Sequence, residues 1–417
     1  MIKKIITHPL FSGSAVMFGG SMIVNGFNYL YHLLMGRILG PADYGSLASI
    51  YSILYVVGIV PLSTSFAIVK FISHAKSKKE RSGIHQSLQK FVLKLALVVS
   101  VIIFLTSPFL AKFLHLKEVV SVALIAPLTF FLLITLVNQA SMQGVLKFFG
   151  TVGPSLTNAI GKLVLGLVLV FLGLGVTGAV FAILLAIIIS YLFSVWLKRG
   201  LFDAKPQKDH FSINRFLRYA WPVLMQALSF TAFFTVDVIL VKHFFPPFEA
   251  GLYAALSTLG KIVYFAAQPI TATMFPIVAG KRSRGERYRE VFFIAFILTV
   301  LISLGIMAAY WLFPDLAIGI LYGKDYLAAK AELVWMGGFM ALYTANYILV
   351  NFLLSIDRTK IVYFTLLVAI GQIVGIIYRH SSLLEVIQVS LVSMFTLFIG
   401  VSLYIMSVQI RKLYAKN

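Results

Sequence analysis

The sequence has no cysteine and few acidic residues. The absence of cysteine excludes disulfides, thiolate metal sites and cysteine nucleophiles. Only 14 Asp and Glu stand against 35 Lys and Arg, and charged residues make up 12% of the 417 positions. The eight histidines are scattered and include no pair at metal-ligand spacing. We therefore expect neither a metal site nor a cofactor.

Apolar residues, by contrast, make up 60% of the chain. Soluble domains average about 45–50% apolar and about 25% charged residues, so this chain has too few polar residues to cover a soluble surface. Because a spanning helix needs about 20 apolar residues, the composition predicts an all-α integral membrane protein with about 12 transmembrane helices. We expect them at 11–36, 46–71, 91–114, 118–141, 152–173, 176–197, 217–243, 250–278, 290–313, 330–354, 361–378 and 383–408.

Most of the cations behind the net charge of +21 fall in connections on one side of these spans, together with both chain ends. The basic connections 72–90, 198–216 and 279–289 are the clearest examples. Because Lys and Arg near spans stay on the inner side, we expect both termini in the cytoplasm and the protein in the cytoplasmic membrane. These loop cations orient the helices and attract anionic lipid. They are too dispersed to predict a nucleic-acid partner.

The two halves of the chain match at one constant offset. Pro41–Ala48 aligns with Pro247–Ala254, and Pro108–Ala111 aligns with Pro314–Ala317. Six spans per half is an even number, so the repeats run parallel, an arrangement typical of transporters with a substrate site between two lobes. We expect an N-terminal six-helix lobe at 1–198, a cytoplasmic linker at 199–216 and a C-terminal six-helix lobe at 217–417. The alternative is a chance match in a low-complexity chain.

The segment Arg37–Gly45 reads Arg-Ile-Leu-Gly-Pro-Ala-Asp-Tyr-Gly. It resembles the Arg-x-Leu-Gly-Pro-x-x-Tyr/Phe-Gly signature of the polysaccharide-biosynthesis flippases, which export O-antigen and exopolysaccharide units and belong to the multidrug/oligosaccharidyl-lipid/polysaccharide (MOP) superfamily. The second half departs from this signature, because His243 stands where Arg37 would repeat and Pro246 where Gly40 would.

This resemblance implies a MATE-like fold and a substrate class. The substrate would be an undecaprenyl-pyrophosphate-linked oligosaccharide, moved from the inner to the outer face of the membrane by alternating access, for cell-surface polysaccharide biosynthesis. The implied partners are this lipid-linked oligosaccharide, membrane lipids, a polysaccharide polymerase and other assembly proteins.

Ionisable residues at membrane depth are costly and therefore indicate function. Lys162 falls inside the fifth expected span, Lys261 inside the eighth and Asp237 inside the seventh. We expect Lys162 and Lys261 to line a cationic cavity for the pyrophosphate, and Arg37 to serve the outward-open state. The structural alternative is an ion pair between Asp237 and Lys261.

Asp237 has a second functional interpretation, because an intramembrane carboxylate can bind Na⁺ or H⁺ and couple transport to an ion gradient. Neutral amides in the spans could provide the donors and acceptors that a sugar needs, and the alternative is hydrogen bonding between helices. The candidate amides are Asn25, Asn28, Asn158, Gln226 and Gln268.

Two other function classes remain beside the flippase. One is a cation-coupled multidrug or metabolite antiporter of the same superfamily. The other is a membrane polysaccharide polymerase or ligase, which needs a sizeable outer loop with catalytic polar residues. The longest expected outer connection, 314–329, holds only Asp315, Lys324 and Asp325 as charged residues. The chain also lacks a nucleotide-binding motif, so we do not expect an enzyme.

Overall fold

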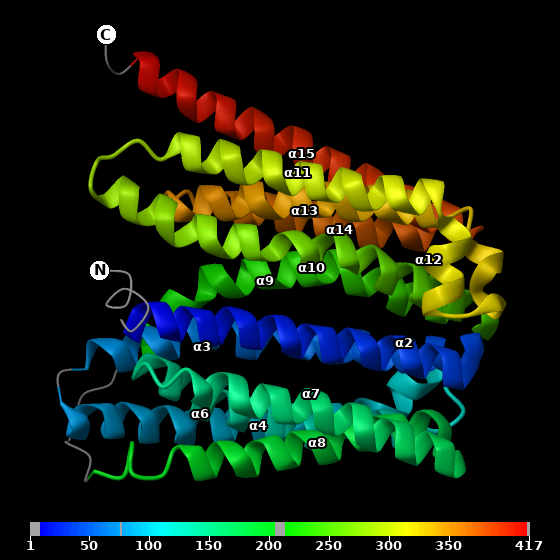
Figure 1. Ribbon diagram of the computed structural model, residues 1–417, viewed down its shortest axis with the longest axis horizontal. Coiled ribbons are helices and arrows are strands. Elements are labelled where there is room, and N and C mark those ends of the chain that lie inside the picture. The colour runs from blue at the N-terminus through cyan, green and yellow to red at the C-terminus, as the bar shows by residue number, and fades with distance from the viewer. Residues whose placement is uncertain (1–8, 76, 205–212, 415–417) are drawn as a thin grey trace. The chain divides into compact units, whose positions relative to one another are not determined.

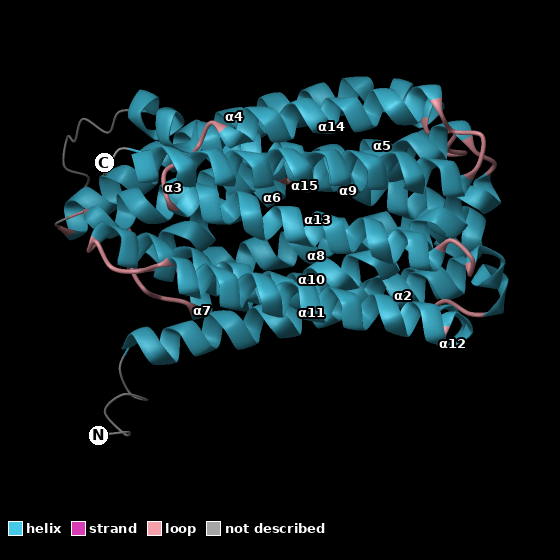
Figure 2. Ribbon diagram, turned by 90° about the horizontal axis from the view of Figure 1, so that it is seen from above, coloured by secondary structure: helices cyan, strands magenta, loops and turns pink. Residues whose placement is uncertain are grey.

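The computed structural model describes residues 9–75, 77–204 and 213–414, and in these ranges the chain forms helices, turns and loops without a strand (Figures 1 and 2). Nine helical segments of the described part are long and apolar enough to cross a membrane. Each span expected from the sequence is occupied by helix. The prediction of an all-α, multi-pass integral membrane protein is confirmed.

The chain forms two compact units, Met1–Leu224 and Met225–Asn417. The linker expected at 199–216 includes residues 205–212, which lie outside the described residues, so its role stays a prediction. Phe202 and Phe216, on either side of these residues, are buried in the core of the first unit.

The helices of the first unit pack side by side. They are α2 (Pro9–Val57), α3 (Ile59–His74), α4 (Lys78–Phe113), α5 (Val119–Ala123), α6 (Ile125–Gly144), α7 (Phe149–Leu169), the π-helix η1 (Val170–Leu174), α8 (Gly175–Leu197) and the first part of α9 (Ile213–Phe244). Helix α7 packs against both α2 and α8, and α6 packs against α3, α4 and α8 (Figure 1).

Helix α2 bends at Gly40, where φ is 73° and ψ is 172°. Glycine reaches this region without a side-chain clash, and Pro41 has no N–H to donate to the preceding turn. The Gly-Pro pair therefore breaks the helix. The chain continues directly into the next helical segment, so the first two expected spans are joined by a bend without a loop.

The fifth and sixth expected spans are also joined tightly. The π-helix η1 and the positive φ angles of Gly173 (87°) and Gly175 (49°) turn the chain between α7 and α8. Together these elements form the continuous apolar segment Phe149–Leu197. One long segment thus contains two of the expected spans.

The second unit contains the rest of α9 and six further elements. They are α10 (Pro247–Ser283), α11 (Arg289–Leu312), α12 (Pro314–Leu321), the 3-10 helix η2 (Lys324–Ala329), α13 (Leu333–Ser355), α14 (Ile361–Tyr378) and α15 (Leu383–Tyr414). Helix α13 packs against α10, α11 and α15. Two hydrogen bonds tie α9 to its neighbours, one from the Tyr343 hydroxyl to the Phe230 carbonyl and one from the Gln372 amide to the Phe233 carbonyl.

The proline pairs that suggested an internal repeat have different structural settings. Pro41 follows the bend in α2 and Pro247 begins α10, so this pair occupies comparable places. Pro108 lies inside α4, whereas Pro314 begins α12.

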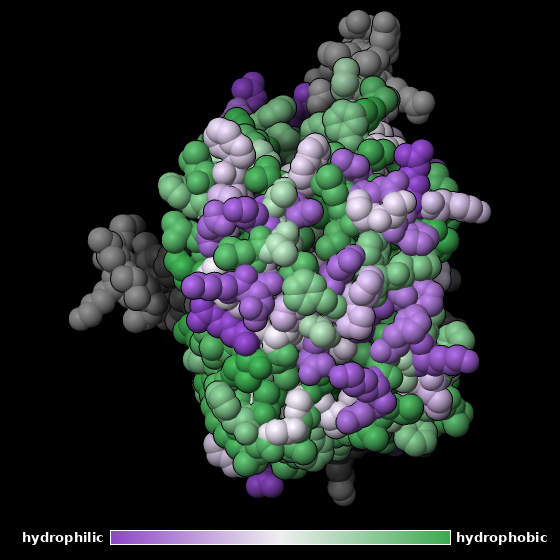
Figure 3. Space-filling model, turned by 90° about the vertical axis from the view of Figure 1, so that its right-hand side faces the viewer, coloured by the Kyte–Doolittle hydropathy of each residue, from purple (hydrophilic) through white to green (hydrophobic). Residues whose placement is uncertain are grey.

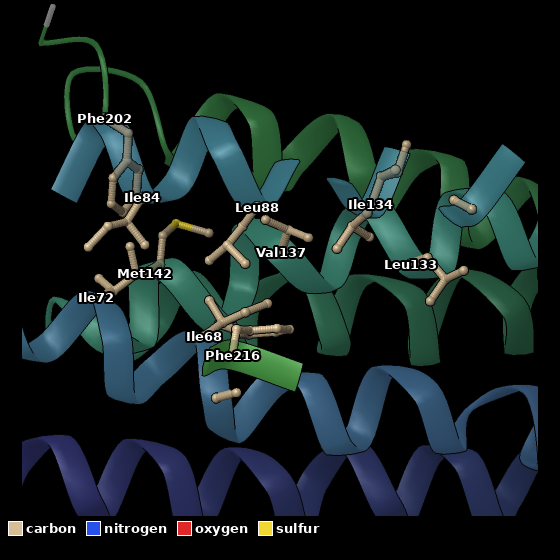
Figure 4. Close-up of a cluster of buried hydrophobic side chains, with 14 of the residues drawn as sticks. Ile68, Ile72, Ile84, Leu88, Leu133, Ile134, Val137, Met142, Phe202 and Phe216 are labelled. Carbon is tan, nitrogen blue, oxygen red and sulfur yellow. The ribbon is translucent and has the colours of Figure 1, made fainter. Parts of the chain in front are cut away.

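Apolar side chains serve two purposes in this fold. Ile68, Leu88, Val137 and Phe216 point toward one another in a cluster formed by several helices of the first unit (Figure 4). Many other apolar side chains are exposed along the helices, such as Leu105 at 71%, as expected of surfaces that contact lipid. The face in Figure 3 carries hydrophilic side chains interspersed with hydrophobic ones.

Candidate functional site

Lys162 is buried in the first unit between two tyrosines. It lies on α7 with 6% of its surface exposed, and its Nζ donates a hydrogen bond of 3.1 Å to the Tyr51 hydroxyl. The same Nζ lies 5.0 Å from the centre of the Tyr31 ring and 5.2 Å from that of Tyr51. Aromatic rings attract a cation through their quadrupole, so both tyrosines stabilise the ammonium.

The ring of Tyr31 is held in place from two sides. Its hydroxyl donates to the Ala179 carbonyl on α8 at 3.1 Å. Gly166, one turn beyond Lys162 on α7, lies against the ring, and a Cβ there would stand 2.8 Å from Tyr31 Cε2. The absence of a side chain at Gly166 therefore lets α7 approach α2 closely enough for Lys162 to reach both rings.

Two of the predicted amides share helix faces with these residues. Asn158 precedes Lys162 by one turn of α7, and Asn28 precedes Tyr31 by three residues of α2; both are half-buried. The Asn158 Oδ1 is buried and has no hydrogen-bond partner among the described residues. A donor on a ligand would satisfy this oxygen.

The two remaining candidates of the first unit are exposed. Asn25 lies on α2, one turn before the half-buried Asn28, and Arg37 lies just before the bend at Gly40. The structure does not place either of them against Lys162.

The second unit holds a different arrangement around Asp237 and Lys261. Asp237 on α9 is 1% exposed, and its Oδ2 accepts a hydrogen bond of 2.8 Å from the Tyr253 hydroxyl on α10. Lys261, also on α10, is 8% exposed, and its Nζ lies 4.9 Å from the centre of the Phe234 ring. Lys261 also acts electrostatically on Asp237, so the acid and the lysine share one neighbourhood.

Aromatic rings surround this neighbourhood. The Tyr264 ring centre is 5.4 Å from that of Tyr343 and 5.2 Å from that of Tyr347, and Phe234 is 5.6 Å from Tyr343. These pairs are tilted or edge-on, as aromatic packing favours. Tyr264 and Tyr347 are half-buried.

The second unit also contains the last two predicted amides. Gln268 follows Lys261 by seven residues on α10, a spacing that puts both on one helix face. Gln226 precedes Phe230 and Phe234 at four-residue steps on α9. Both amides are half-buried.

The predicted site residues thus fall into two groups, one in each unit. Sequence reasoning identified the charged members but missed Tyr31, Tyr51, Phe234 and Tyr253, which contact them. One signal was available, because Gly166 stands one turn from Lys162 and a glycine at that spacing indicates a close helix approach. In the described part of the chain, no three His, Asp or Glu residues form a group that could hold a metal ion.

The two buried lysines differ in what surrounds them. The hydrogen-bond partner of Lys162 is a neutral tyrosine hydroxyl, whereas Lys261 has the carboxyl of Asp237 in its neighbourhood. In surroundings of low dielectric constant, charges attract each other more strongly than in water. Because its hydrogen-bond partner is a neutral hydroxyl, the charge of Lys162 is available to attract an anion.

Comparisons with known proteins agree with this fold. The sequence matches the family described as "Polysaccharide biosynthesis protein" over residues 34–331. It is 23% identical over 279 residues to an uncharacterized membrane protein of Methanocaldococcus jannaschii, covering 61% of this chain. The matched part spans 64% of the length of that curated relative.

Solved structures of similar fold cover nearly the whole chain. The lipid II flippase MurJ in an inward closed conformation has a TM-score of 0.71 at 16% identity, covering 93% of this chain and 87% of its own. A eukaryotic MATE transporter has a TM-score of 0.67 at 15% identity, with 95% of both chains covered. A MOP superfamily transporter of Pyrococcus furiosus has a TM-score of 0.64 at 17% identity, covering 97% of this chain and 98% of its own.

The structural similarity shows that the predicted MATE-like fold is correct. The family match extends over more than half of the sequence and includes the whole segment Arg37–Gly45 together with Lys162, Asp237 and Lys261. The chain is therefore a member of the polysaccharide biosynthesis protein family and has the fold of the MOP superfamily transporters.

Proposed function

We propose that the protein is a transporter, specifically a flippase that moves an undecaprenyl-pyrophosphate-linked oligosaccharide across the cytoplasmic membrane for cell-surface polysaccharide biosynthesis. It works by alternating access, with both termini in the cytoplasm, and it is not an enzyme. The observation that carries the proposal is the buried ammonium of Lys162, held by two neutral tyrosines.

A buried cation with neutral partners suits an anionic substrate group. Charge-assisted hydrogen bonds from an ammonium to phosphate oxygens are short and strong, and the low dielectric constant strengthens them further. The pyrophosphate of the carrier lipid supplies such oxygens. Lys261 provides a second buried cation in the other unit.

The neutral groups near the lysines suit the sugar part of the substrate. The Asn158 Oδ1 has an unfilled acceptor position, and Gln226 and Gln268 add half-buried amides in the second unit. Tyr264 and Tyr347 are half-buried, and their hydroxyls can donate and accept hydrogen bonds. Apolar ring faces beside hydroxyl and amide groups match the mixed apolar and polar surface of a pyranose.

Deletion of the gene that encodes the protein tests the function. We expect lipid-linked oligosaccharide to accumulate on the inner face of the membrane and surface polysaccharide to fall. Unchanged surface polysaccharide would contradict the proposal.

Substitution of the lysines tests the site. Lys162→Ala and Lys261→Ala should each impair export at unchanged protein level, because each removes a cation that attracts the pyrophosphate. Lys94→Ala is a matched control, since Lys94 is an exposed lysine on α4. Full export by both buried-lysine variants would refute the cationic site.

Asp237 favours a second candidate function, the cation-coupled multidrug or metabolite antiporter. A buried carboxyl hydrogen-bonded to Tyr253 can bind H⁺ or Na⁺ and respond to a gradient. The two functions differ in phenotype. The antiporter predicts that expression confers resistance to small cationic drugs and that deletion leaves surface polysaccharide intact.

A further inference from the structure

A groove in the first unit lies apart from the residues around Lys162. It is lined by the start of α2, the turn between α6 and α7, and the end of α8. It has a volume of about 530 Å³. Most of its wall is apolar, and two cationic side chains join that wall. The residues that matter most are Leu146, Phe148, Phe149, Leu197, Lys147 and Arg199.

Local backbone geometry builds one side of this groove. Leu146 has a positive φ of 61°, and the amide of Lys147 bonds to the Met142 carbonyl at 2.9 Å, so the chain turns sharply between α6 and α7. Gly150 lets these helices meet, because a Cβ there would stand 2.4 Å from Met142 Sδ. Lys147 is exposed in this tight turn.

A second turn brings Arg199 to the same groove. After α8 ends, Gly200 adopts a φ of 75°, and its amide donates a hydrogen bond of 2.7 Å to Asp203 Oδ2. Arg199 is exposed and lines the groove with Lys147. The two cations therefore come from different connections and meet at one apolar wall.

Aromatic side chains mark the level of this groove in the membrane. Trp196 is 59% exposed and stacks on Phe193 with ring centres 5.8 Å apart. Phe193 in turn lies 6.4 Å from Phe149, which lines the groove. Exposed tryptophans gather at the depth of the lipid headgroups, so the groove lies where headgroup and acyl chain meet.

We infer that the groove binds an anionic phospholipid of the surrounding membrane. The phosphate lies between Lys147 and Arg199, and the part of an acyl chain nearest the headgroup lies along Leu146, Phe148 and Phe149. Basic pockets beside apolar helix surfaces bind anionic headgroups in this way. This role is separate from substrate transport, because the groove contains none of the residues around Lys162 or around Lys261.

The combination of wall and charge distinguishes this occupant from others. A zwitterionic lipid carries its own cation, which Lys147 and Arg199 repel. A free phosphate has no chain to cover the apolar wall. An anionic phospholipid uses both features of the groove.

Lipid binding by the purified full-length protein tests the inference. The delipidated protein in detergent is mixed with phosphatidylglycerol, with phosphatidylcholine or with inorganic phosphate, and bound lipid is counted by native mass spectrometry. We expect retention of phosphatidylglycerol over phosphatidylcholine, no competition by inorganic phosphate, and at least tenfold weaker phosphatidylglycerol binding by Lys147→Gln/Arg199→Gln.

A double variant of equal charge change serves as the control. Lys90→Gln/Lys94→Gln removes two exposed lysines of α4, which do not line the groove, and should bind phosphatidylglycerol as the wild type does. Arg199→Lys keeps the charge and should retain most of the binding, which separates loss of charge from loss of fold.

Three results would overturn the inference. Equal retention of both lipids would show an apolar groove without charge selection. Displacement by inorganic phosphate would show a free-anion site. Unchanged binding by Lys147→Gln/Arg199→Gln, or equal losses in the control, would show that these two cations do not hold the lipid.

Discussion

The ammonium of Lys162 on α7 donates a hydrogen bond of 3.1 Å to the hydroxyl of Tyr51 on α2. Tyr51 lies beyond the bend at Gly40, whereas Tyr31, the second ring beside the ammonium, lies before it. Lys162 therefore connects the two arms of α2. Substitutions on the two sides of this contact can therefore test separately how it affects the stability of the first unit and how the lysine charge affects export.

Tyr51→Phe should destabilise the protein, because it removes the hydrogen-bond acceptor of a buried ammonium. A hydrogen bond to a charged group contributes about 1.5–3 kcal/mol. Adding Lys162→Met to this variant removes the buried charge as well and should restore most of the stability. Export by the double variant should remain impaired, because the cation that attracts the pyrophosphate is gone. Thermal unfolding and export assays on the single and double variants measure both effects.

Tyr378→Phe is the control for Tyr51→Phe, since Tyr378 is 83% exposed. It should unfold at the wild-type temperature. Equal instability of Tyr51→Phe with and without Lys162→Met would contradict the assignment of the effect to a buried charge.

Gly166→Ala should disturb the contact between α7 and Tyr31. Its Cβ would stand 2.8 Å from Tyr31 Cε2, and overpacking of this kind costs about 1–3 kcal/mol. We expect a lower unfolding temperature in detergent and reduced export, because the ring beside Lys162 is displaced. Gly371→Ala on α14 meets nothing within 4 Å and should show neither effect; a similar loss in both variants would sink the explanation.

Asp237→Asn should abolish the dependence of transport on an ion gradient if this carboxyl couples the two. Asparagine keeps an oxygen that can accept the Tyr253 hydroxyl but cannot gain or lose the proton. Export into reconstituted vesicles, measured with and without imposed proton and sodium gradients, tests this. Asp325→Asn, an exposed acid, is the control, and retained gradient dependence in Asp237→Asn counts against coupling.

Phe202→Ala should destabilise the first unit. Phe202 is 3% exposed and stacks on His85 at 4.4 Å, and His85 itself bonds to Ser141 at 2.9 Å. Truncating a buried phenylalanine costs about 3–5 kcal/mol. Phe171→Ala, at a ring that is 73% exposed, should cost far less, and equal unfolding temperatures for the two variants would argue against burial of Phe202 in solution.

The fold was largely predictable from the sequence. Long apolar stretches predict where helices lie, and the bend at Gly40 falls between the first two expected spans, 11–36 and 46–71. Helix ends were less predictable, since the ranges around Gly40 and Gly173 were expected to separate spans and are instead tight bends within continuous helical segments. Hydropathy does not distinguish a loop from a bend, because both contain apolar residues.

The sequence suggested charged and amide candidates for the site but not the tyrosines that contact the charged ones. A lysine or aspartate inside an apolar stretch is conspicuous, so Lys162, Lys261 and Asp237 could be singled out. Their tyrosine partners come from other helices, and contacts over long sequence separations, such as that from Lys162 to Tyr51, leave no local pattern. Asn25 shows a different difficulty. Its position within an expected span did not indicate that its side chain is exposed.

The bend at Gly40 divides α2 into two arms that both contact one buried lysine. The two rings that stabilise the Lys162 ammonium sit on opposite arms of this bend, so opening or closing it changes how well the cation is shielded. An anion that draws the ammonium away would in turn release one arm from the other. A substitution at Gly40 would therefore be expected to alter the surroundings of Lys162 without touching the lysine itself.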